Sequence, residues 1–377
     1  MHPPHDQQPG QVTLGVYTLG GTIAMTTTVT PASVTSGVVP TLTATDLLAA
    51  VPGLADAGVE LAAYDVRQRP GASLTMADVA HLAATIIDHH RTGAITAAVV
   101  TQGTDTIEET AWLLHLLLRL AGEADVPVVV TGAMRNPTLA GADGPANLLA
   151  AVQVAASTSA PGLGVTVVFG DTVHAAADVR KAHTTSVTAF TSPTTGPIGD
   201  LVEARPRIWR RPTTPPLPPG VIDPGRLDQL RVPVLPAALG ADPGLIDAIA
   251  AGTDGLVVAG FGVGHVPDTW VAALQGAAAA MPVVLTSRIG VGSTATSTYA
   301  FPGSEQDLLA RGLVNGGHLD PYKARILLQV LLHTDSSLPA IEQAFRQFGG
   351  LPDNPGAPPV RREPTHTASE GSAHART

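Results

Sequence analysis

The chain has 377 residues, of which 44% are hydrophobic and 14% are charged, and this composition can form a large core. Its formal net charge of −10 argues against nucleic acids and anionic membrane surfaces, because both need a basic face. No apolar run is long enough to span a membrane. The absence of cysteine excludes disulfides, thiolate metal sites and thiol nucleophiles.

The length predicts two domains. The composition of the two ends predicts a tail at each of them. Residues 1–10 and 353–377 are rich in Pro, Gly, Ser and His without periodicity, so we expect them to be disordered. The first of these segments lacks the charged and then apolar pattern of a signal peptide. A cytoplasmic protein is therefore expected.

Between the tails, apolar strand-like runs alternate with helix-like segments, which predicts an α/β fold with a parallel sheet and right-handed crossovers. The first half contains expected strands at about 12–18, 59–66, 94–100, 126–131 and 163–169, and expected helices at about 45–51, 75–92, 105–121 and 143–157.

Residues 205–226 are dense in proline, which excludes a sheet interior or a long helix, and we interpret them as an interdomain linker. A second alternation follows, with expected strands near 231–235, 255–260 and 282–286 and helices near 243–251, 267–280, 304–312, 320–333 and 336–347. The sequence thus predicts a larger N-terminal α/β domain at 11–204, which is expected to be catalytic, and a smaller C-terminal α/β domain at 227–350.

Hydroxyl and charged residues follow four of the predicted strands. The segments are LGGT (19–22), TQGTDT (101–106), AMRNP (133–137) and ADVRKAHTTS (177–186). Ligands bind beyond the carboxyl ends of the strands in an open parallel sheet. We therefore expect these segments to share one rim of the sheet.

This set of residues is suited to acyl transfer through a threonyl acyl-enzyme. Thr22 follows paired glycines at a strand end and needs activation to become a nucleophile. Lys181, held beside Thr104 and Asp105, would act as the base or would stay charged and orient the network. Backbone N–H groups of the glycine-rich loops would stabilise an oxyanion.

Each residue also has a structural interpretation when it is taken alone. Thr22 fits a tight turn with a capping threonine, and Thr104 and Asp105 are common N-capping types. Lys181 fits a solvated surface lysine, and Asp143 fits the cap of a helix with proline in its first turn. Their joint occurrence on one rim favours catalysis.

The motifs TLGGTIA, QGTDTIEETA, TGAMR followed by ADGPANL, and DVRKAHTTSVTAF occur in an order and spacing that resemble the bacterial-type L-asparaginase/glutaminase family. The resemblance covers about residues 12–350. It implies a large and a small α/β domain and a homotetramer built from intimate dimers. It also implies release of ammonia from Asn or Gln without a metal or an organic cofactor.

The resemblance assigns roles to individual residues. Thr22 matches the family's nucleophilic threonine, while Thr104, Asp105 and Lys181 match its second threonine, substrate-binding aspartate and lysine. Asp105 would pair with the α-amino group of the substrate. Ala133 matches the position whose backbone faces the side-chain amide.

The first motifs also depart from the family. Leu19 replaces the first threonine of the usual Thr-Gly-Gly-Thr, and residues 25–43, an expected lid, contain no tyrosine to contact the nucleophile. The position of the serine that binds the substrate carboxylate falls near Gly71, with Ala72 and Ser73 beside it.

The C-terminal half departs in the residues that a neighbouring subunit often supplies. The corresponding regions read GFGVGH (260–265) and SRIGVGSTATSTYAFPGSE (287–305), and the family's asparagine and glutamate are missing from their usual places in them. Tyr299 is either a replacement contact or a core aromatic residue.

We expect hydrolysis of the side-chain amide of L-asparagine to aspartate and ammonia by a homo-oligomer. The changed substrate contacts leave a glutaminase or another small-amide hydrolase as an alternative. A catalytically weak protein that binds or senses amino acids is an alternative of another class. GFGVGH also fits a dinucleotide turn, but the next strand lacks the required acid.

Overall fold

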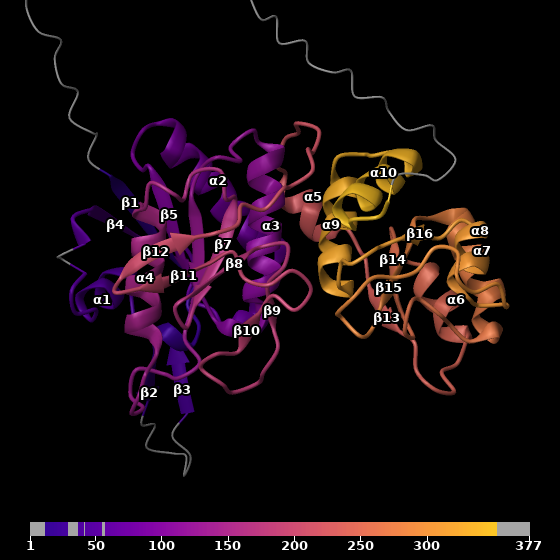
Figure 1. Ribbon diagram of the computed structural model, residues 1–377, viewed down its shortest axis with the longest axis horizontal. Helices are drawn as coiled ribbons and strands as arrows, with labels where there is room; N and C mark the ends of the chain where they lie inside the picture. Colours follow the sequence, from indigo (N-terminus) through magenta and orange to yellow (C-terminus); the bar gives the residue numbers. More distant parts are fainter. Residues whose placement is uncertain (1–11, 29–36, 41, 55–56, 353–377) are drawn as a thin grey trace, which may run out of the picture.

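The computed structural model describes residues 12–28, 37–40, 42–54 and 57–352. They form two lobes, each built around its own sheet (Figure 1). The lobe coloured indigo to magenta contains an eight-stranded sheet, and the orange lobe contains a four-stranded sheet. The predicted fold class, a larger and a smaller α/β unit, is confirmed.

The large sheet is parallel over five strands and antiparallel over the remaining three. From edge to edge its strands are β12 (Arg205–Ile208), β11 (Gly199–Val202), β8 (Thr172–Ala175), β7 (Val165–Phe169), β6 (Val128–Thr131), β5 (Ala97–Thr101), β1 (Thr13–Thr18) and β4 (Glu60–Asp65).

Helices cover both faces of this sheet, which is why its central strands are continuous apolar runs. On β5, Val100 packs into the core beneath α2 (Met76–Arg91) and α3 (Ile107–Leu120). The preceding Val99 packs into the opposite core with α1 (Ala44–Ala49) and α4 (Gly144–Ala156). Successive side chains of a strand point to opposite faces, so both cores are filled by the same strands.

The segment 205–226, which we assigned to a linker, needs a correction. Its first four residues form β12, and its last residues begin α5 (Pro224–Gln229). β12 is an edge strand that pairs only with β11. Such a strand tolerates Pro206 because the missing N–H removes no bond from the sheet interior.

The second sheet is parallel throughout, in the order β13 (Val234–Pro236), β14 (Leu256–Gly260), β15 (Val283–Ser287) and β16 (Val314–Asn315). Its last, two-residue strand was not predicted. The helices of this lobe are α6 (Gly244–Ala250), α7 (Val271–Ala280), α8 (Glu305–Ala310), α9 (Pro321–His333) and α10 (Leu338–Phe348).

The two lobes share one apolar core where α3 lies beside α9 (Figure 1). Leu117 of α3 and Leu327 of α9 belong to the same buried cluster, and Phe345 of α10 completes it. The indole N–H of Trp112 donates to the main-chain carbonyl of Lys323 at 3.0 Å. The lobes are thus joined by buried contacts and not only by the connecting chain.

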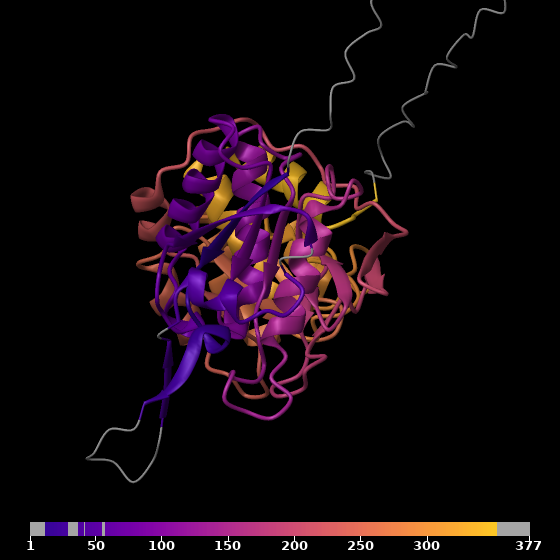
Figure 2. The same ribbon diagram turned by 90° about the vertical axis from the view of Figure 1, so that its left-hand side faces the viewer.

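Short elements follow the strand ends. The expected lid, residues 25–43, includes an antiparallel ribbon of β2 (Met25–Thr28) and β3 (Gly37–Pro40), which extends from the body in Figure 2. Residues 29–36 and 41 of that lid lie outside the described part of the chain. The other short elements are η1 (Thr22–Ala24), η3 (Gly71–Ser73), η4 (Thr104–Thr106), β9 (Arg180–Lys181), β10 (Phe190–Thr191) and η5 (Asp268–Trp270).

The strand order creates a switch point at β1, because β4 lies on one side of it and β5 on the other. The loops after these strands diverge beyond their carboxyl ends, where open α/β sheets bind ligands. Leu19 N–H still donates to the Thr101 carbonyl at 2.9 Å. The loops after β1 and β5 therefore begin side by side.

Three glycines allow these loops to touch backbone to backbone. A Cβ on Gly21 would lie 1.9 Å from the Gly103 nitrogen, and a Cβ on Gly103 would lie 2.7 Å from the Gly71 nitrogen. Gly21 also has a φ of +84°, which favours glycine. Any side chain here would push apart the loops after β1, β4 and β5.

We predict that Gly21→Ala destabilises the fold more than Gly53→Ala. Gly53 has a similar φ of +77° but nothing within 4 Å of its added Cβ, so it reports the cost of the backbone angle alone, about 1–2 kcal/mol. Gly21→Ala adds a steric overlap that costs a further ~1–3 kcal/mol. Urea unfolding measures both, and equal losses in the two variants would contradict the close packing.

His115 is a buried titratable group on α3. Its ring stacks on Trp112 with centroids 5.6 Å apart, and Nδ1 accepts the N–H of Val165 at 3.3 Å. Burial, with a smaller effect of Arg119, lowers the pKa of His115 to about 3. The folded protein therefore holds this imidazole neutral at pH values where the unfolded chain protonates it.

We predict that His115 contributes to acid destabilisation. Between pH ~6.5 and ~3 the unfolded state binds a proton that the native state does not, so stability falls as pH falls, by up to about 1.4 kcal/mol per pH unit. His115→Gln should remove this part of the slope. Unfolding free energies across this range measure the effect, and above pH ~7.5 the curves of the two proteins should run parallel. Identical slopes below pH 6 would contradict the prediction.

Candidate active site

Lys181, Thr104 and Asp105 lie together at the carboxyl end of the large sheet. The Lys181 ammonium donates to Thr104 Oγ1 at 3.0 Å and to Asp105 Oδ1 at 2.8 Å. Thr104 is buried, whereas 64% of the Asp105 side chain is exposed. The group thus combines a buried hydroxyl, an ion pair and an accessible carboxylate.

The structural interpretations of these three residues do not agree with the geometry. The side chains of Thr104 and Asp105 make no capping bond to α3, whose N-cap is Thr106 and also lacks one. Only 17% of the Lys181 side chain is exposed, so Lys181 is not a solvated surface lysine. The side chains of Thr104 and Asp105 accept hydrogen bonds from Lys181 instead.

The backbone around Lys181 is held from two sides. Lys181 pairs with Phe190 in the β9–β10 ribbon, and the N–H of Ala182 donates to the carbonyl of Ala189. The N–H of Lys181 donates to the carboxylate of Glu108, in the first turn of α3. Burial raises the pKa of Glu108, while Lys323 and the bond from Lys181 oppose that rise.

An open cavity of about 330 Å³ adjoins the ion pair. Asp105 and Lys181 line it together with Ala182, His183 and Thr184. Sequence reasoning did not single out His183, although it lies two residues after Lys181. Its Nδ1 accepts N–H groups of the following turn, from Thr185 and Ser186 at 3.1 and 2.9 Å. This cavity is large enough for a small amino acid next to the exposed carboxylate.

The backbone of Thr22 reaches the same end of the sheet. Thr22 begins η1 directly after Gly21, which packs on Gly103, and Thr104 directly follows Gly103. The side chain of Thr22 lies outside the described part of the structure. Thr22 and Thr104 are therefore each one residue away from the contact between Gly21 and Gly103, one on each loop.

Ala133 lies close to this contact as well. A Cβ on Gly144 would meet Ile23 at 3.0 Å and Ala133 at 3.4 Å, so both flank the start of α4. The preceding Gly132 packs against the carbonyl of Gln102, because a Cβ there would lie 2.6 Å from this oxygen. The loop after β6 thus joins those after β1 and β5.

Asp143 holds this loop, although we interpreted it as a helix cap. It makes no side-chain cap bond to α4, because its carboxylate accepts the N–H groups of Met134 at 3.0 Å and Arg135 at 2.8 Å. Asn147, one turn later, donates to the Gly132 carbonyl at 3.0 Å. Sequence reasoning missed Asn147, and its only signal was a polar residue on a buried helix face.

The expected carboxylate-binding segment forms η3 after β4. Gly71 is buried against Gly103, and its carbonyl accepts the Thr106 hydroxyl at 3.0 Å. Ala72 and Ser73 are exposed. The segment therefore reaches the site through its backbone and presents the exposed Ser73 beside it.

Tyr299 lies in the smaller lobe. It is 44% exposed, which excludes the core-aromatic interpretation. It packs edge-on against His265 with ring centroids 4.8 Å apart, and its N–H donates to Glu305 at 2.8 Å. Among the residues that the structure describes, the hydrogen bonds and ring contacts of Tyr299 all lie within its own lobe. None of them reaches Lys181.

Two classes of feature are not found in the described part of the chain. Its His, Asp and Glu residues form no group of three or more that is arranged to hold a metal ion. None of its helices combines the length and apolar character needed to cross a membrane.

Comparison with known protein families identifies both lobes. Residues 13–214 match the family model "Asparaginase, N-terminal", and residues 231–345 match "Glutaminase/Asparaginase C-terminal domain". The matched ranges contain Thr22, Thr104, Asp105 and Lys181, as well as Tyr299.

Individual relatives agree with these matches. A probable L-asparaginase of Deinococcus radiodurans is 37% identical over 79% of this chain and 88% of its own. L-asparaginase 2 of Escherichia coli is 37% identical over 66% and 70% of the two chains. The crystal structure of a probable cytoplasmic L-asparaginase from Campylobacter jejuni superposes with a TM-score of 0.76 at 28% identity, over 89% of this chain and all of that one. This chain therefore belongs to the asparaginase/glutaminase family of amidohydrolases.

Proposed function

We propose that this enzyme hydrolyses the side-chain amide of L-asparagine to aspartate and ammonia. The observation that carries the proposal is the Lys181–Thr104–Asp105 network, placed beside the backbone of Thr22 and open to a cavity. Several relatives are named L-asparaginases, which supports asparagine as the substrate. We take the catalytic unit to be residues 11–204, with residues 227–350 as the second domain.

In the proposed reaction Thr22 is the nucleophile. Its oxygen attacks the amide carbon, and backbone N–H groups of the glycine-rich loops stabilise the resulting oxyanion. The C–N bond then breaks, and the threonine proton leaves with the nitrogen as ammonia. Water attacks the threonyl ester, which releases aspartate and restores the hydroxyl.

Lys181 has an orienting role in this proposal. Its side-chain nitrogen is shared between the Asp105 carboxylate and Thr104 Oγ1, so both partners fix its position. Because Thr104 accepts this bond, its own hydroxyl hydrogen stays available as a donor toward the reacting groups. The network therefore fixes the position of the Thr104 side chain and directs its hydroxyl hydrogen away from Lys181.

The exposed groups of the site suggest how the substrate is bound. The accessible carboxylate of Asp105 is suited to the α-amino group of the substrate, and the η3 segment Gly71–Ser73 is suited to its α-carboxylate. The backbone at Ala133, held by Asp143, would face the side-chain amide. We propose no cofactor and no metal in any step.

A glutaminase is the second candidate. A relative from Acinetobacter glutaminasificans that is 29% identical over 80% of this chain is named glutaminase-asparaginase. The cavity beside Asp105 and Lys181 is open, so the longer side chain of glutamine is sterically allowed. An amino-acid-binding protein without catalysis is the alternative of another class.

We also propose a homo-oligomer, a dimer of intimate dimers, and a cytoplasmic location. Exposed apolar residues gather on the loop after β15 and would be covered in an assembly: Ile289, Val291, Tyr299 and Phe301. The Campylobacter jejuni structure is described as cytoplasmic, whereas a relative from Haemophilus influenzae is described as periplasmic. Cell fractionation of the source organism decides the location.

We predict that the purified protein releases ammonia from L-asparagine and that Thr22→Ala removes this activity without unfolding the protein. Thr85→Ala is the control, because the exposed Thr85 hydroxyl donates to the His81 carbonyl of its own helix at 2.9 Å. An ammonia assay with L-Asn, D-Asn and L-Gln at millimolar concentration gives the readout. Release from glutamine alone favours the glutaminase, and binding without release favours the sensing protein.

We predict an oligomer at micromolar concentration. Light scattering should give a mass at least twice the 38.3 kDa of the chain. Phe301→Glu places a charge on the exposed apolar loop and should shift the mass toward the monomer. A monomer at micromolar concentration in the unmodified protein would refute the proposed assembly.

A further inference from the structure

The chain contains only two lysines, Lys181 and Lys323, among its 21 lysine and arginine residues. Lys181 belongs to the proposed catalytic network. Lys323 lies in the first turn of α9 in the smaller lobe, and only 2% of it is exposed. Both lysines therefore occupy protected positions, and they approach the same short segment of chain.

Lys323 joins the two lobes through its backbone and its side chain. Its carbonyl accepts the indole N–H of Trp112 on α3, as described above. Its ammonium donates to the main-chain carbonyl of Val179 and lies 3.4 Å from Asp320 Oδ2. Val179 is only two residues before Lys181, at the entrance to β9.

Glu108 holds the same segment from α3. Its carboxylate accepts the N–H of Lys181, and the positive charge of Lys323 favours the ionised form of this carboxylate. Lys323 thus acts on the Lys181 segment directly through Val179 and electrostatically through Glu108. The bond from Lys323 to Val179 is buried and the bond from Lys181 to Glu108 is partly buried, and hydrogen bonds to charged groups are strong in such surroundings.

The smaller lobe also contacts Arg180, which lies between Val179 and Lys181. The guanidinium of Arg180 fills the space beside Gly290, in the loop after β15, because a Cβ on Gly290 would overlap it at 1.4 Å. Gly290 also has a φ of +73°. Residues 179–181 are therefore held by α9, by α3 and by the loop after β15.

A lysine suits the buried position better than an arginine. An ammonium is a compact group that the Val179 carbonyl and the Asp320 carboxylate can satisfy, whereas a guanidinium presents five donors in a rigid plane. A buried charge with unsatisfied donors is strongly destabilising. A lysine at position 323 therefore fits this buried site better than an arginine would.

We propose that Lys323 is a positioning residue, through which the smaller lobe places the ammonium of Lys181 against Thr104 and Asp105. Its contribution to the reaction rests on the proposed function of Lys181. Its contribution to the geometry is independent of that function and is measured separately by the NMR signal of the Lys181 side chain.

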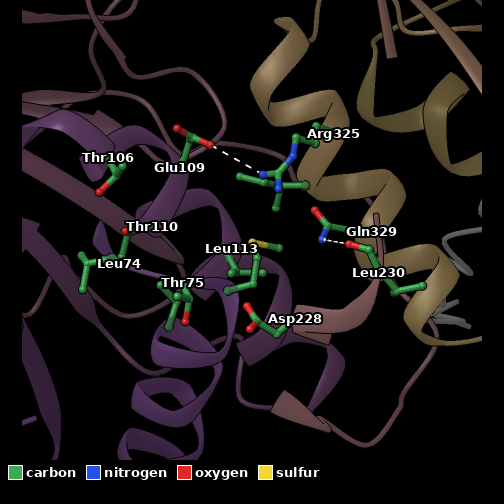
Figure 3. A pocket seen from close by; sticks show the side chains of 13 residues that line it. Leu74, Thr75, Thr106, Glu109, Thr110, Leu113, Asp228, Leu230, Arg325 and Gln329 are labelled. Atoms are coloured by element: carbon green, nitrogen blue, oxygen red, sulfur yellow. Dashed lines mark hydrogen bonds and ion pairs between the residues drawn. The ribbon is translucent and has the colours of Figure 1, made fainter. Parts of the chain in front are cut away.

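The first test is Lys323→Met, which removes the ammonium and keeps the length of the side chain. Displacing a catalytic group by about 1 Å costs up to ~100-fold in rate, so we expect kcat to fall about 10–100-fold while KM changes less than about threefold. Arg325→Met is the matched control, because Arg325 is also a cation of α9 that faces α3. Its guanidinium lies 3.9 Å from the Glu109 carboxylate, as Figure 3 shows, and its Nε donates to the main-chain carbonyl of Val232 at 2.9 Å.

The second readout is the NMR signal of the Lys181 side chain. Protein labelled at the lysine ε-carbon gives two signals from the folded chain, and Lys181→Met assigns them. In Lys323→Met one signal remains, and we expect it to shift from its wild-type position. In Arg325→Met we expect both signals at their wild-type positions.

A second variant keeps the test decisive if Lys323→Met does not fold. Glu108→Gln retains the shape of the side chain and removes its charge, while Glu109→Gln is the control on the adjacent residue. We expect Glu108→Gln to shift the Lys181 signal and to lower kcat by a smaller factor than Lys323→Met. Glu109→Gln should do neither.

The outcomes separate the two proposals. An unshifted Lys181 signal together with unchanged kcat in Lys323→Met would overturn the positioning role. Equal losses in Lys323→Met and Arg325→Met would also overturn it, because they would reflect a general weakening of the contact between the lobes. If Lys181→Met keeps full activity while Lys323→Met still shifts the Lys181 signal, the catalytic role of Lys181 fails and the positioning of its side chain stands.

Discussion

Direct contact between backbones, at Gly21, Gly71 and Gly103, is the constraint on which the rest of the site depends. Because no side chain separates these loops, their backbones are in direct contact, and the residues that follow the glycines are held close together. Thr22 and Thr104 each come immediately after one of them. The glycines therefore bring the backbones of two hydroxyl-bearing residues together, and the cost is a set of positions that accept no other residue.

The remaining groups of the site come from separate parts of the fold. Asp105 belongs to the loop after a central parallel strand, whereas Lys181 belongs to a ribbon beyond the antiparallel extension. Such a ribbon has little core of its own and needs external contacts to hold a side chain in place. Glu108 and Lys323 provide them, so the smaller lobe takes part in the site without entering the cavity.

The sequence predicted the features that depend on local pattern. Apolar runs and helical periodicity located most helices and strands, and the rule for carboxyl strand ends brought Thr104, Asp105 and Lys181 to one place. It did not predict β12, because proline is tolerated only where a strand has a free edge. It also did not predict the partners of Asp143, Glu108 and Lys323, which depend on side-chain directions across the fold. The bond between Lys323 and Val179 joins residues 144 positions apart, and no local pattern records such a distance.

The continuous apolar core between α3 and α9 has a mechanical consequence. Lobes that meet through a thin polar contact can rotate about their connection, whereas a closely packed interior resists displacement. The shared core between α3 and α9 therefore opposes rotation of one lobe against the other. The cavity beside Asp105 and Lys181 is already open with the lobes in this arrangement, so a substrate can reach the exposed carboxylate without such a rotation.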